Sequence, residues 1–132
     1  MEITKLDHIG IRVMEFPRSI QFYRNFSFQV IREDYNEGII VLKHPSGIEL
    51  NLLNSGNDNH GNKNILMDCE RRYPGYTHYA IAVSSVLEVK AVLENLAIDI
   101  TEGPVTFGDG KTSLFIRDPD LNVIEFTELP EK

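Results

Sequence analysis

Two histidines and two glutamates recur in the same order in the two halves of this 132-residue chain. His8 and Glu49 belong to the first half, and His78 and Glu125 belong to the second. Each lies in a short run that alternates apolar residues with others, as a half-buried strand does. Imidazole nitrogens and carboxylate oxygens bind divalent ions such as Zn²⁺, Ni²⁺, Co²⁺, Mn²⁺ and Fe²⁺. The repeated pattern predicts one metal site better than it predicts core packing.

The repeat extends well beyond these four residues. A shift of 70 positions aligns residues 8–32 with residues 78–102 without a gap, and apolar positions match along the stretch. The offset is 74 at Pro45 and Pro119, and it becomes 76 if the two glutamates are matched. We interpret this growth as a few extra loop residues in the second copy.

The first half is predicted to form a strand, a helix and three further strands. Residues 6–13 alternate with the period of two that a half-buried strand has. Residues 17–26 begin with a proline and space apolar residues three apart, which is typical of an amphipathic helix. Three strand-like runs follow, over residues 29–33, 38–43 and 47–53.

The second half repeats this order. A strand around His78 is followed by Ser85 and Glu88, a capping box that predicts the start of a helix. The apolar stripe of that helix is expected at Val86, Val89, Val92, Leu93 and Leu96. Three strands are then predicted near residues 98–102, 113–117 and 123–129.

These patterns predict an α+β fold in a single domain, residues 1–132, made of two βαβββ modules over residues 4–54 and 74–129. Modules this short are not expected to be stable separately. The stretch 54–64 is polar and rich in Asn and Gly, so we expect a mobile loop that serves as a linker, with a lid as the alternative. His60 inside it is interpreted as a solvated histidine.

Composition narrows the class of protein. With 42% hydrophobic residues the chain can bury a core, and no run approaches the roughly 18 apolar residues of a membrane span. A net charge of −7 without a basic patch argues against a nucleic-acid partner. Cys69 is the single cysteine, which agrees with a reducing compartment. We expect a soluble cytoplasmic protein that acts on a small molecule.

Strand alternation sets the direction of the candidate ligands. Glu49 lies between Ile48 and Leu50, and Glu125 also lies between two apolar neighbours, so both carboxylates face away from the apolar layer. His8 and His78 follow the same rule. If the modules pack as pseudo-symmetric partners, the four side chains converge on one ion, and a six-coordinate ion keeps two positions for substrate oxygens.

The chain resembles the vicinal oxygen chelate superfamily, which includes glyoxalase I, fosfomycin-resistance transferases, extradiol dioxygenases, methylmalonyl-CoA epimerase and bleomycin-binding proteins. The resemblance is carried by the segments LDHIGIRV, RSIQFY, PGYTHYAIAV, EGPV and RDPDLNVIEF. It implies paired βαβββ modules that close a U-shaped mixed sheet around a metal. It also implies His8, Glu49, His78 and Glu125 as ligands, a full set that is most similar to glyoxalase I.

Three positions depart from the family pattern. The usual Leu-Gly-Phe after the first helix has Ser27 at its centre, and Leu121 replaces the common Gly after Asp-Pro-Asp. The asparagine that contacts glutathione in glyoxalase I corresponds to Leu53. This last departure weakens glutathione as the cosubstrate.

The resemblance also suggests residues that hold the substrate. Arg12 lies where glyoxalase I has an arginine for the glutathione carboxylate, and Lys111 lies near a position where some members use lysine. An ordinary surface role for Arg12 is the alternative. The loop 54–76 could shape the pocket through Arg72, Tyr73 or Tyr76.

The function that the resemblance implies is a metal-dependent lyase or isomerase of glyoxalase I type. Such an enzyme acts on a small vicinal-oxygen substrate through a metal-bound enediolate, with a ligand glutamate as base. We expect Glu125 in this role first and Glu49 second. Two alternatives stay open: an Fe²⁺ ring-cleaving dioxygenase, and a small-molecule-binding resistance protein. By analogy with the family we also expect a homodimer, with sites shared between the two subunits.

Overall fold

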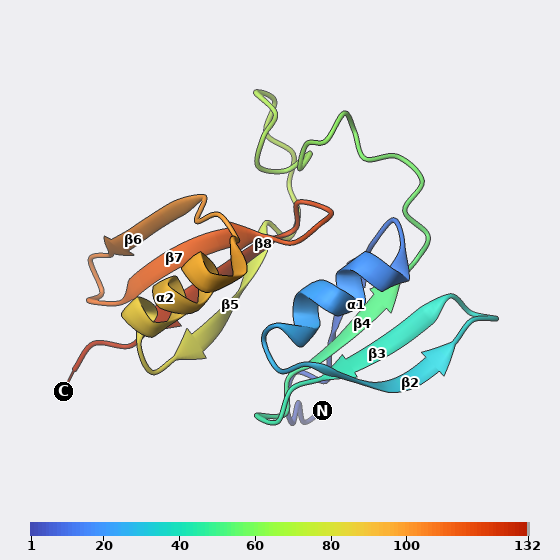
Figure 1. Ribbon diagram of the computed structural model, residues 1–132, viewed down its shortest axis with the longest axis horizontal. Helices are drawn as coiled ribbons and strands as arrows, with labels where there is room; N and C mark the ends of the chain where they lie inside the picture. Colours follow the sequence, from blue (N-terminus) through green and yellow to red (C-terminus); the bar gives the residue numbers. More distant parts are fainter. Residues whose placement is uncertain (132) are drawn as a thin grey trace. The chain divides into compact units, whose positions relative to one another are not determined.

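The computed structural model describes residues 1–131 and divides into two compact units, Met1–Gly61 and the part of the chain from Asn62 onward (Figure 1). Each unit contains one helix and a four-stranded mixed sheet. The α+β class and the two βαβββ modules predicted from the sequence are therefore confirmed. No helix among the described residues is long and apolar enough to cross a membrane.

The first unit follows the predicted order closely. Its elements are β1 (Ile9–Arg12), α1 (Phe16–Arg24), β2 (Gln29–Asp34), β3 (Ile39–Lys43) and β4 (Glu49–Leu53). The sheet order is β1-β4-β3-β2, with β1 parallel to β4 and the other pairs antiparallel. A parallel pair needs a long crossover, which here contains α1 and the β2–β3 hairpin.

Alternation along the central strands creates the core of the first unit. Leu50 and Leu52 of β4 are fully buried, whereas their neighbours Glu49 and Asn51 are half-buried on the opposite face. Helix α1 covers the apolar side through Phe16 and Tyr23. Each fully buried apolar side chain contributes roughly 1.5–3 kcal/mol to folding. The candidate ligand face is thus the face that the core does not use.

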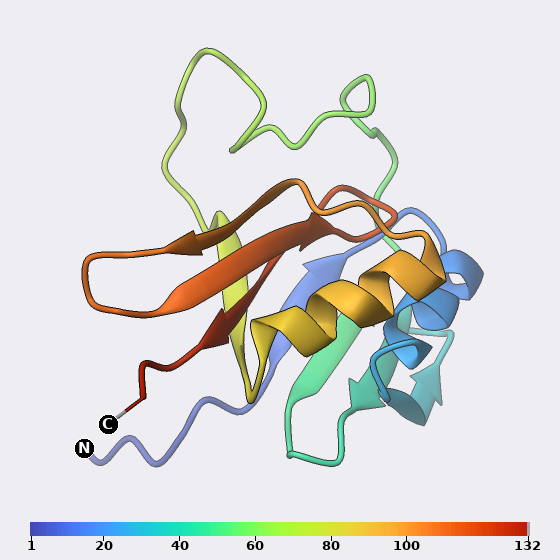
Figure 2. The ribbon, with the colours of Figure 1, turned by 60° about the vertical axis from the view of Figure 1, so that its left-hand side comes forward.

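The second unit has the same construction. Its elements are β5 (His78–Val83), α2 (Val86–Leu96), β6 (Glu102–Thr106), β7 (Thr112–Arg117) and β8 (Val123–Glu128). The sheet order is β5-β8-β7-β6, with β5 parallel to β8. Figure 2 shows α2 lying along this sheet, and a long segment without helix or strand between β4 and β5.

Helix α2 begins as predicted but buries less than predicted. The Ser85 hydroxyl accepts from the Glu88 N–H at 3.2 Å, while the Val86 N–H donates to Glu128 of β8 at 2.9 Å. Val86 and Leu93, two turns apart, are buried. The predicted stripe is wrong in two members, listed here with their exposure: Val92 at 44% and Leu96 at 36%. The helix lies against β7 and β8, and only Val86 and Leu93 of the α2 residues are buried.

The strand predicted over residues 98–102 is also wrong. The Ile98 N–H donates to the Leu93 carbonyl and therefore ends helix α2. Ala97, with φ at 55°, makes the left-handed turn that this ending requires. Strand β6 begins only at Glu102.

The two β-hairpins that carry the candidate glutamates have equal loops. Lys43 pairs with Glu49 in the first unit, and Arg117 pairs with Val123 in the second. The second hairpin therefore contains no extra residues. The two extra residues that the matching of Glu49 with Glu125 placed in this loop are therefore wrong. The four residues that raise the offset from 70 to 74 lie earlier in the second copy, between Glu102 and Phe115, because Arg32 pairs with Val41 as Glu102 pairs with Phe115.

The pairing of the parallel strands shows the same offset between the two copies. Gly10 lies two residues after His8 and pairs with Asn51. Ala80 lies two residues after His78 and pairs with Glu125. The offset of 74 thus continues along β8. Asn51, and not Glu49, is the structural counterpart of Glu125.

Two residues noted as departures from the family pattern adopt left-handed backbone conformations. Ser27 has φ at 68° and follows α1, and Leu121 has φ at 66° in the β7–β8 turn. Such a conformation costs a residue with a Cβ atom roughly 1–2 kcal/mol, and it costs glycine almost nothing. Positions 27 and 121 therefore keep the left-handed backbone conformation that favours glycine, although neither residue is a glycine.

We predict that Ser27→Gly raises the free energy of unfolding by about 0.5–1 kcal/mol, because Ser27 is exposed and its side chain contributes little packing. Urea denaturation followed by circular dichroism measures the change. Ser27→Ala keeps the Cβ atom and serves as the control, with no gain expected. A lower urea midpoint for the glycine variant would contradict a strained Ser27.

Candidate metal centre

The second unit brings together two of the four predicted ligands. His78 Nε2 lies 2.9 Å from Glu125 Oε1, across the parallel β5–β8 pair. The His78 side chain is 34% exposed and the Glu125 side chain 15% exposed. Both point away from the core face, as strand alternation requires. An imidazole and a carboxylate thus lie in contact on one partly open face of the sheet.

The other carboxylate oxygen of Glu125 accepts a hydrogen bond from the neighbouring strand β7. The Ser113 hydroxyl, fully buried on β7, donates to Glu125 Oε2 at 2.7 Å. Phe115, the direct partner of Glu125 on β7, lies edge-on to the His78 ring at 5.7 Å. These contacts fix the carboxylate and the imidazole in place. Sequence reasoning missed Ser113, although a serine beside the apolar run LFI was a visible signal.

Gly103 allows β6 to approach Ser113 closely. A Cβ atom at Gly103 would lie 2.5 Å from the Ser113 carbonyl oxygen, and φ at Gly103 is +84°. The β6–β7 register shifts at this point, between Glu102 and Val105. Any side chain at position 103 would therefore displace the strand segment that holds Glu125.

The second nitrogen of His78 also has a partner. Thr77 Oγ1 lies 2.9 Å from His78 Nδ1. With Nε2 directed at a carboxylate, Nε2 carries the proton and Nδ1 accepts from the threonine hydroxyl. If Nε2 instead binds a metal, the proton moves to Nδ1, which then donates to the same hydroxyl. Thr77 can support either tautomer.

The first unit places its two predicted ligands differently. His8 precedes β1 and its Nδ1 lies 2.8 Å from Asp7 Oδ2, an exposed contact that lowers the pKa of the Asp7 carboxyl. Glu49, the first residue of β4, lies 3.7 Å from Lys43 Nζ on the neighbouring strand. No contact joins His8 to Glu49 in the way that His78 meets Glu125.

The residues of the second unit fit a metal, but only as a partial set. Among residues 1–131, no three His, Cys, Asp or Glu side chains gather closely enough to hold an ion. The donor chemistry of His78 and Glu125 suits Zn²⁺, Ni²⁺, Co²⁺, Mn²⁺ or Fe²⁺.

A family comparison decides the class of this protein. Residues 5–126 match the model of the glyoxalase/bleomycin resistance protein/dioxygenase superfamily. The chain belongs to this superfamily. Its members include enzymes such as lactoylglutathione lyase as well as resistance proteins that are not enzymes.

Solved structures of the superfamily fold cover nearly the whole chain. An integron cassette protein of V. cholerae is 27% identical, with 97% of each chain covered and a TM-score of 0.68. A virulence protein from Salmonella typhimurium is 25% identical, with 98% of this chain and 99% of that chain covered and a TM-score of 0.69. Lactoylglutathione lyase from Agrobacterium tumefaciens is 18% identical, with coverage of 97% and 96% and a TM-score of 0.70. The last similarity shows the fold alone. A comparison with curated protein sequences found no match.

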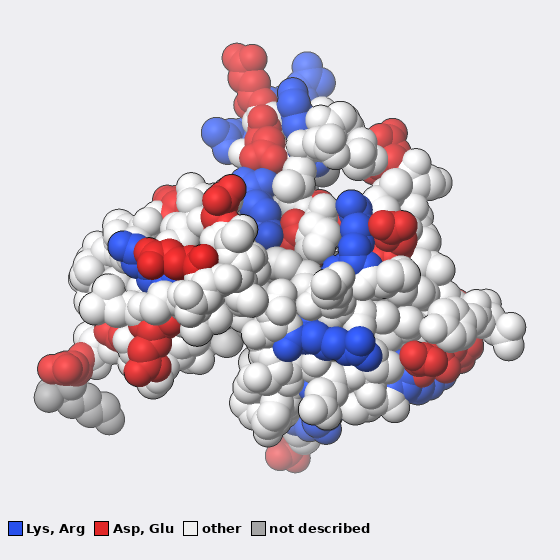
Figure 3. All heavy atoms as spheres, in the orientation of Figure 1, with Lys and Arg blue, Asp and Glu red and all other residues white. Residues whose placement is uncertain are grey.

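The predicted substrate-binding residues of this superfamily member lie on exposed positions. Arg12 Nε donates to the Ser55 hydroxyl at 3.0 Å, which ties β1 to the segment that leaves β4. Lys111 lies in the β6–β7 turn, 3.9 Å from Asp109. Tyr76 is fully exposed. Acidic and basic side chains are interspersed over the face shown in Figure 3, in a chain of net charge −7.

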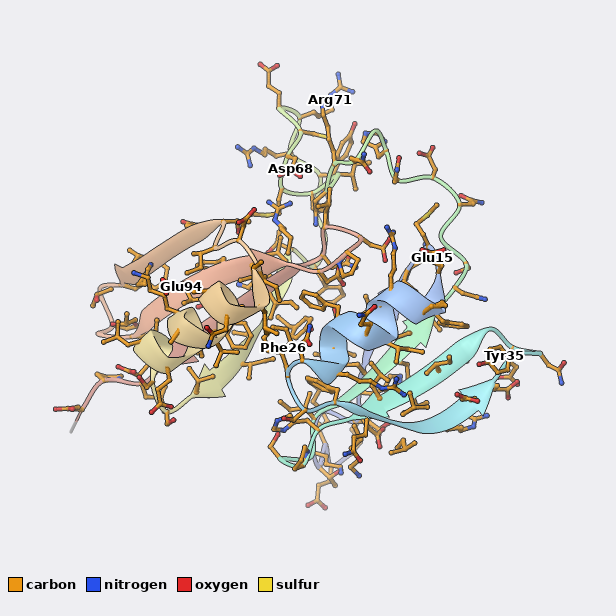
Figure 4. All side chains as sticks on the ribbon, viewed as in Figure 1. Glu15, Phe26, Tyr35, Asp68, Arg71 and Glu94 are labelled. Carbon is orange, nitrogen blue, oxygen red and sulfur yellow. The ribbon has the colours of Figure 1, made fainter. Side chains whose placement is uncertain are left out.

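The segment before β5 is attached to the β7–β8 hairpin by a charged pair. Asp68, which Figure 4 labels together with Arg71 on this segment, accepts two hydrogen bonds from Arg117 at 2.9 and 3.0 Å. Asp68 also accepts from the Asn64 N–H at 2.7 Å, and the Asn64 side chain donates to the Leu121 carbonyl at 3.0 Å. The part of the predicted loop from Asn64 to Asp68 is thus fixed to the hairpin by specific bonds.

We predict that Asp68→Asn lowers the free energy of unfolding by about 1 kcal/mol at pH 7, since a forked arginine–carboxylate pair is lost. The Arg117 hydrogen bonds, and then the Asn64 N–H, hold the pKa of Asp68 below its usual range. The stabilisation is therefore complete above about pH 4, the ordinary carboxyl pKa, and disappears as the pH falls through the lower folded-state pKa. Urea denaturation from pH 2 to 7 measures it.

The matched control is Asp109→Asn, which removes an exposed carboxylate 3.9 Å from Lys111. We expect a change below about 0.5 kcal/mol that hardly depends on pH. If the difference in unfolding free energy between Asp68→Asn and the parent protein grew as the pH fell, the pKa of Asp68 would be shifted in the opposite direction. That result would contradict a stabilising pair between Asp68 and Arg117.

Proposed function

We propose that the protein is a metal-dependent enzyme of glyoxalase I type, a lyase or isomerase that moves a proton on a small substrate with two adjacent oxygens. The observation that supports this most is the His78–Glu125 contact at 2.9 Å, with Ser113 fixing the second carboxylate oxygen. Superfamily membership supports the substrate class. His8 and one oxygen of the first module, predicted from the sequence to be Glu49, would complete the ligand set.

A divalent ion at this site would polarise the adjacent oxygens of the substrate and acidify the neighbouring C–H group. Glu125 is then the best-placed base, because Ser113 can keep one of its oxygens fixed while the other takes the proton. Glu49 remains the second choice for the base. Arg12 and Lys111 would attract an anionic group of the substrate.

We predict tight binding of about one divalent ion per site and a loss of at least 100-fold in affinity in His78→Ala and in Glu125→Ala. Competition with a chromogenic chelator, using Zn²⁺ or Ni²⁺, measures the affinity. His44→Ala and His60→Ala, which remove histidines of the exposed turns, are the controls and should bind like the parent protein. Equal affinity in all four variants would remove the proposed metal centre.

The reaction type is tested on metal-loaded protein by solvent exchange. We expect α-protons of 2-oxoaldehyde–thiol adducts or α-hydroxyketones to exchange with deuterated water, because proton transfer is the proposed step. The adduct of glutathione is the first to test, although Leu53 makes another thiol or acid a better expectation. Oxygen consumption with a catechol and no exchange would favour the dioxygenase alternative, and ligand binding without turnover would favour a resistance protein.

We further predict that Thr77→Val lowers metal affinity by about 10-fold, because the hydroxyl can no longer accept the Nδ1 proton of a metal-binding His78. The same chelator competition measures it. Thr106→Val, which removes a hydroxyl bonded to Thr112 in the β6–β7 hairpin, is the matched control. Parent-like affinity in Thr77→Val would show that His78 does not bind metal through Nε2.

A further inference from the structure

The turn between β3 and β4 joins a serine hydroxyl to a histidine ring. Ser46 Oγ lies 2.7 Å from His44 Nδ1. Both residues belong to the first unit, and neither is a ligand of the proposed metal centre. A hydroxyl within hydrogen-bond distance of an imidazole is the arrangement that activates a serine as a nucleophile.

A second hydrogen bond to the same ring nitrogen shows which group donates. The backbone N–H of Ser46 donates to His44 Nδ1 at 2.9 Å. A ring nitrogen that accepts from an N–H carries no proton, so the proton of the neutral imidazole lies on Nε2. The Ser46 hydroxyl is therefore the donor in the 2.7 Å contact, and His44 Nδ1 is in the state that a general base requires.

The His44 ring is held in place by its surroundings. It is half-buried, and its centroid lies 5.3 Å from that of Phe28, a residue that is only 2% exposed. The His44 N–H donates to the Ile48 carbonyl, and the His44 carbonyl accepts from the Gly47 N–H, both at 2.9 Å. The imidazole therefore does not have to be reoriented before it accepts a proton.

Ser46 itself is exposed at the tip of the turn. The next residue, Gly47, has φ at +102°, a left-handed conformation that favours glycine. A Cβ atom built at Gly47 would meet no atom within 4 Å, so the space beside Ser46 is open. A reagent can thus reach Ser46 Oγ without a change in the fold.

We infer that Ser46 is a site of covalent acylation, with His44 as its general base. The acyl donor is a thioester or an aryl ester. Ser46 Oγ attacks the carbonyl carbon, and the hydroxyl proton passes to His44 Nδ1. The bond from the acyl carbon to the leaving sulfur or oxygen breaks, and the leaving group takes the proton from Nδ1. An ester on Ser46 and a free thiol or phenol result, with no oxidant or reductant required.

The hydrogen-bond pattern favours donors with good leaving groups. When Nδ1 takes the proton it can no longer accept from the Ser46 N–H, so the step costs this bond. Thiolates and phenolates leave more readily than amines or alkoxides and offset that cost. The activity goes beyond the metal-dependent function proposed above and does not rest on it.

Acetylation by p-nitrophenyl acetate tests the inference on the complete chain, with a chelator present so that bound metal plays no part. We expect about one acetyl group per chain, located at Ser46 by peptide mass spectrometry, and release of p-nitrophenolate in a burst. Ser84, an exposed serine outside the turn, is the internal control and should react at least about 10-fold more slowly. Equal acetylation of Ser46 and Ser84 would overturn the inference.

Substitution of the base gives a second test. Ser46→Ala should lose the burst. His44→Gln should slow acetylation of Ser46 at least about 10-fold, because glutamine can accept the hydrogen bonds but is too weak a base to take the proton. Circular dichroism and the urea midpoint show whether the variant folds as the parent does. A folded His44→Gln variant that is acetylated at the parent rate would contradict the role of His44.

A measurement on the parent protein covers the case of a His44→Gln variant that does not fold. Acetylation of Ser46 should be slower in deuterated water, since the hydroxyl proton moves to His44 Nδ1 as the ester bond forms. Equal rates in the two solvents would contradict this proton transfer.

Discussion

The parallel pairing of β5 with β8 is the constraint on which the candidate site depends. It aligns Ala80 with Glu125, so that His78, two residues earlier on the same face, reaches the carboxylate diagonally. A shift of one residue would turn the glutamate toward the core, because successive side chains alternate between faces. The register is held by Ile124 and Phe126, which are buried on the other side of β8. Core packing in the second unit therefore also positions the side chains of His78 and Glu125.

The same register in the first unit carries different residues. Duplication kept the strand order, the hairpin length and the alternation, but the position of Glu125 is taken by Asn51 and that of Ala80 by Gly10. The second unit has a bonded carboxylate where the first has an unpaired amide oxygen. The modules are thus equivalent in fold and unequal in charge at this position.

Most of the fold could be predicted from the sequence, because strand alternation and the Ser85 cap are local signals. The site could be predicted only in part. The contact between His78 and Glu125 agrees with their residue types and repeat positions, whereas the motif IEL aligned Glu49 with Glu125 by identity and so missed that Asn51 is the counterpart of Glu125 in the strand register. The strand register that corrects this alignment depends on pairing between distant residues, which one sequence does not contain. The serine beside the apolar run LFI indicated a polar residue on β7, but its bond to Glu125 depends on the β7–β8 pairing. The U-shaped closure of the two modules, the homodimer and the shared site remain predictions.

The most direct test of the metal centre is a crystal structure of the Zn²⁺- or Ni²⁺-loaded protein, with anomalous scattering recorded at the metal absorption edge. The account predicts a single strong peak about 2.0–2.2 Å from both His78 Nε2 and Glu125 Oε1. It also predicts that the 2.9 Å hydrogen bond between these two side chains is replaced by their bonds to the ion. A peak bound elsewhere, or an intact His78–Glu125 hydrogen bond without a peak at saturating metal, would contradict it.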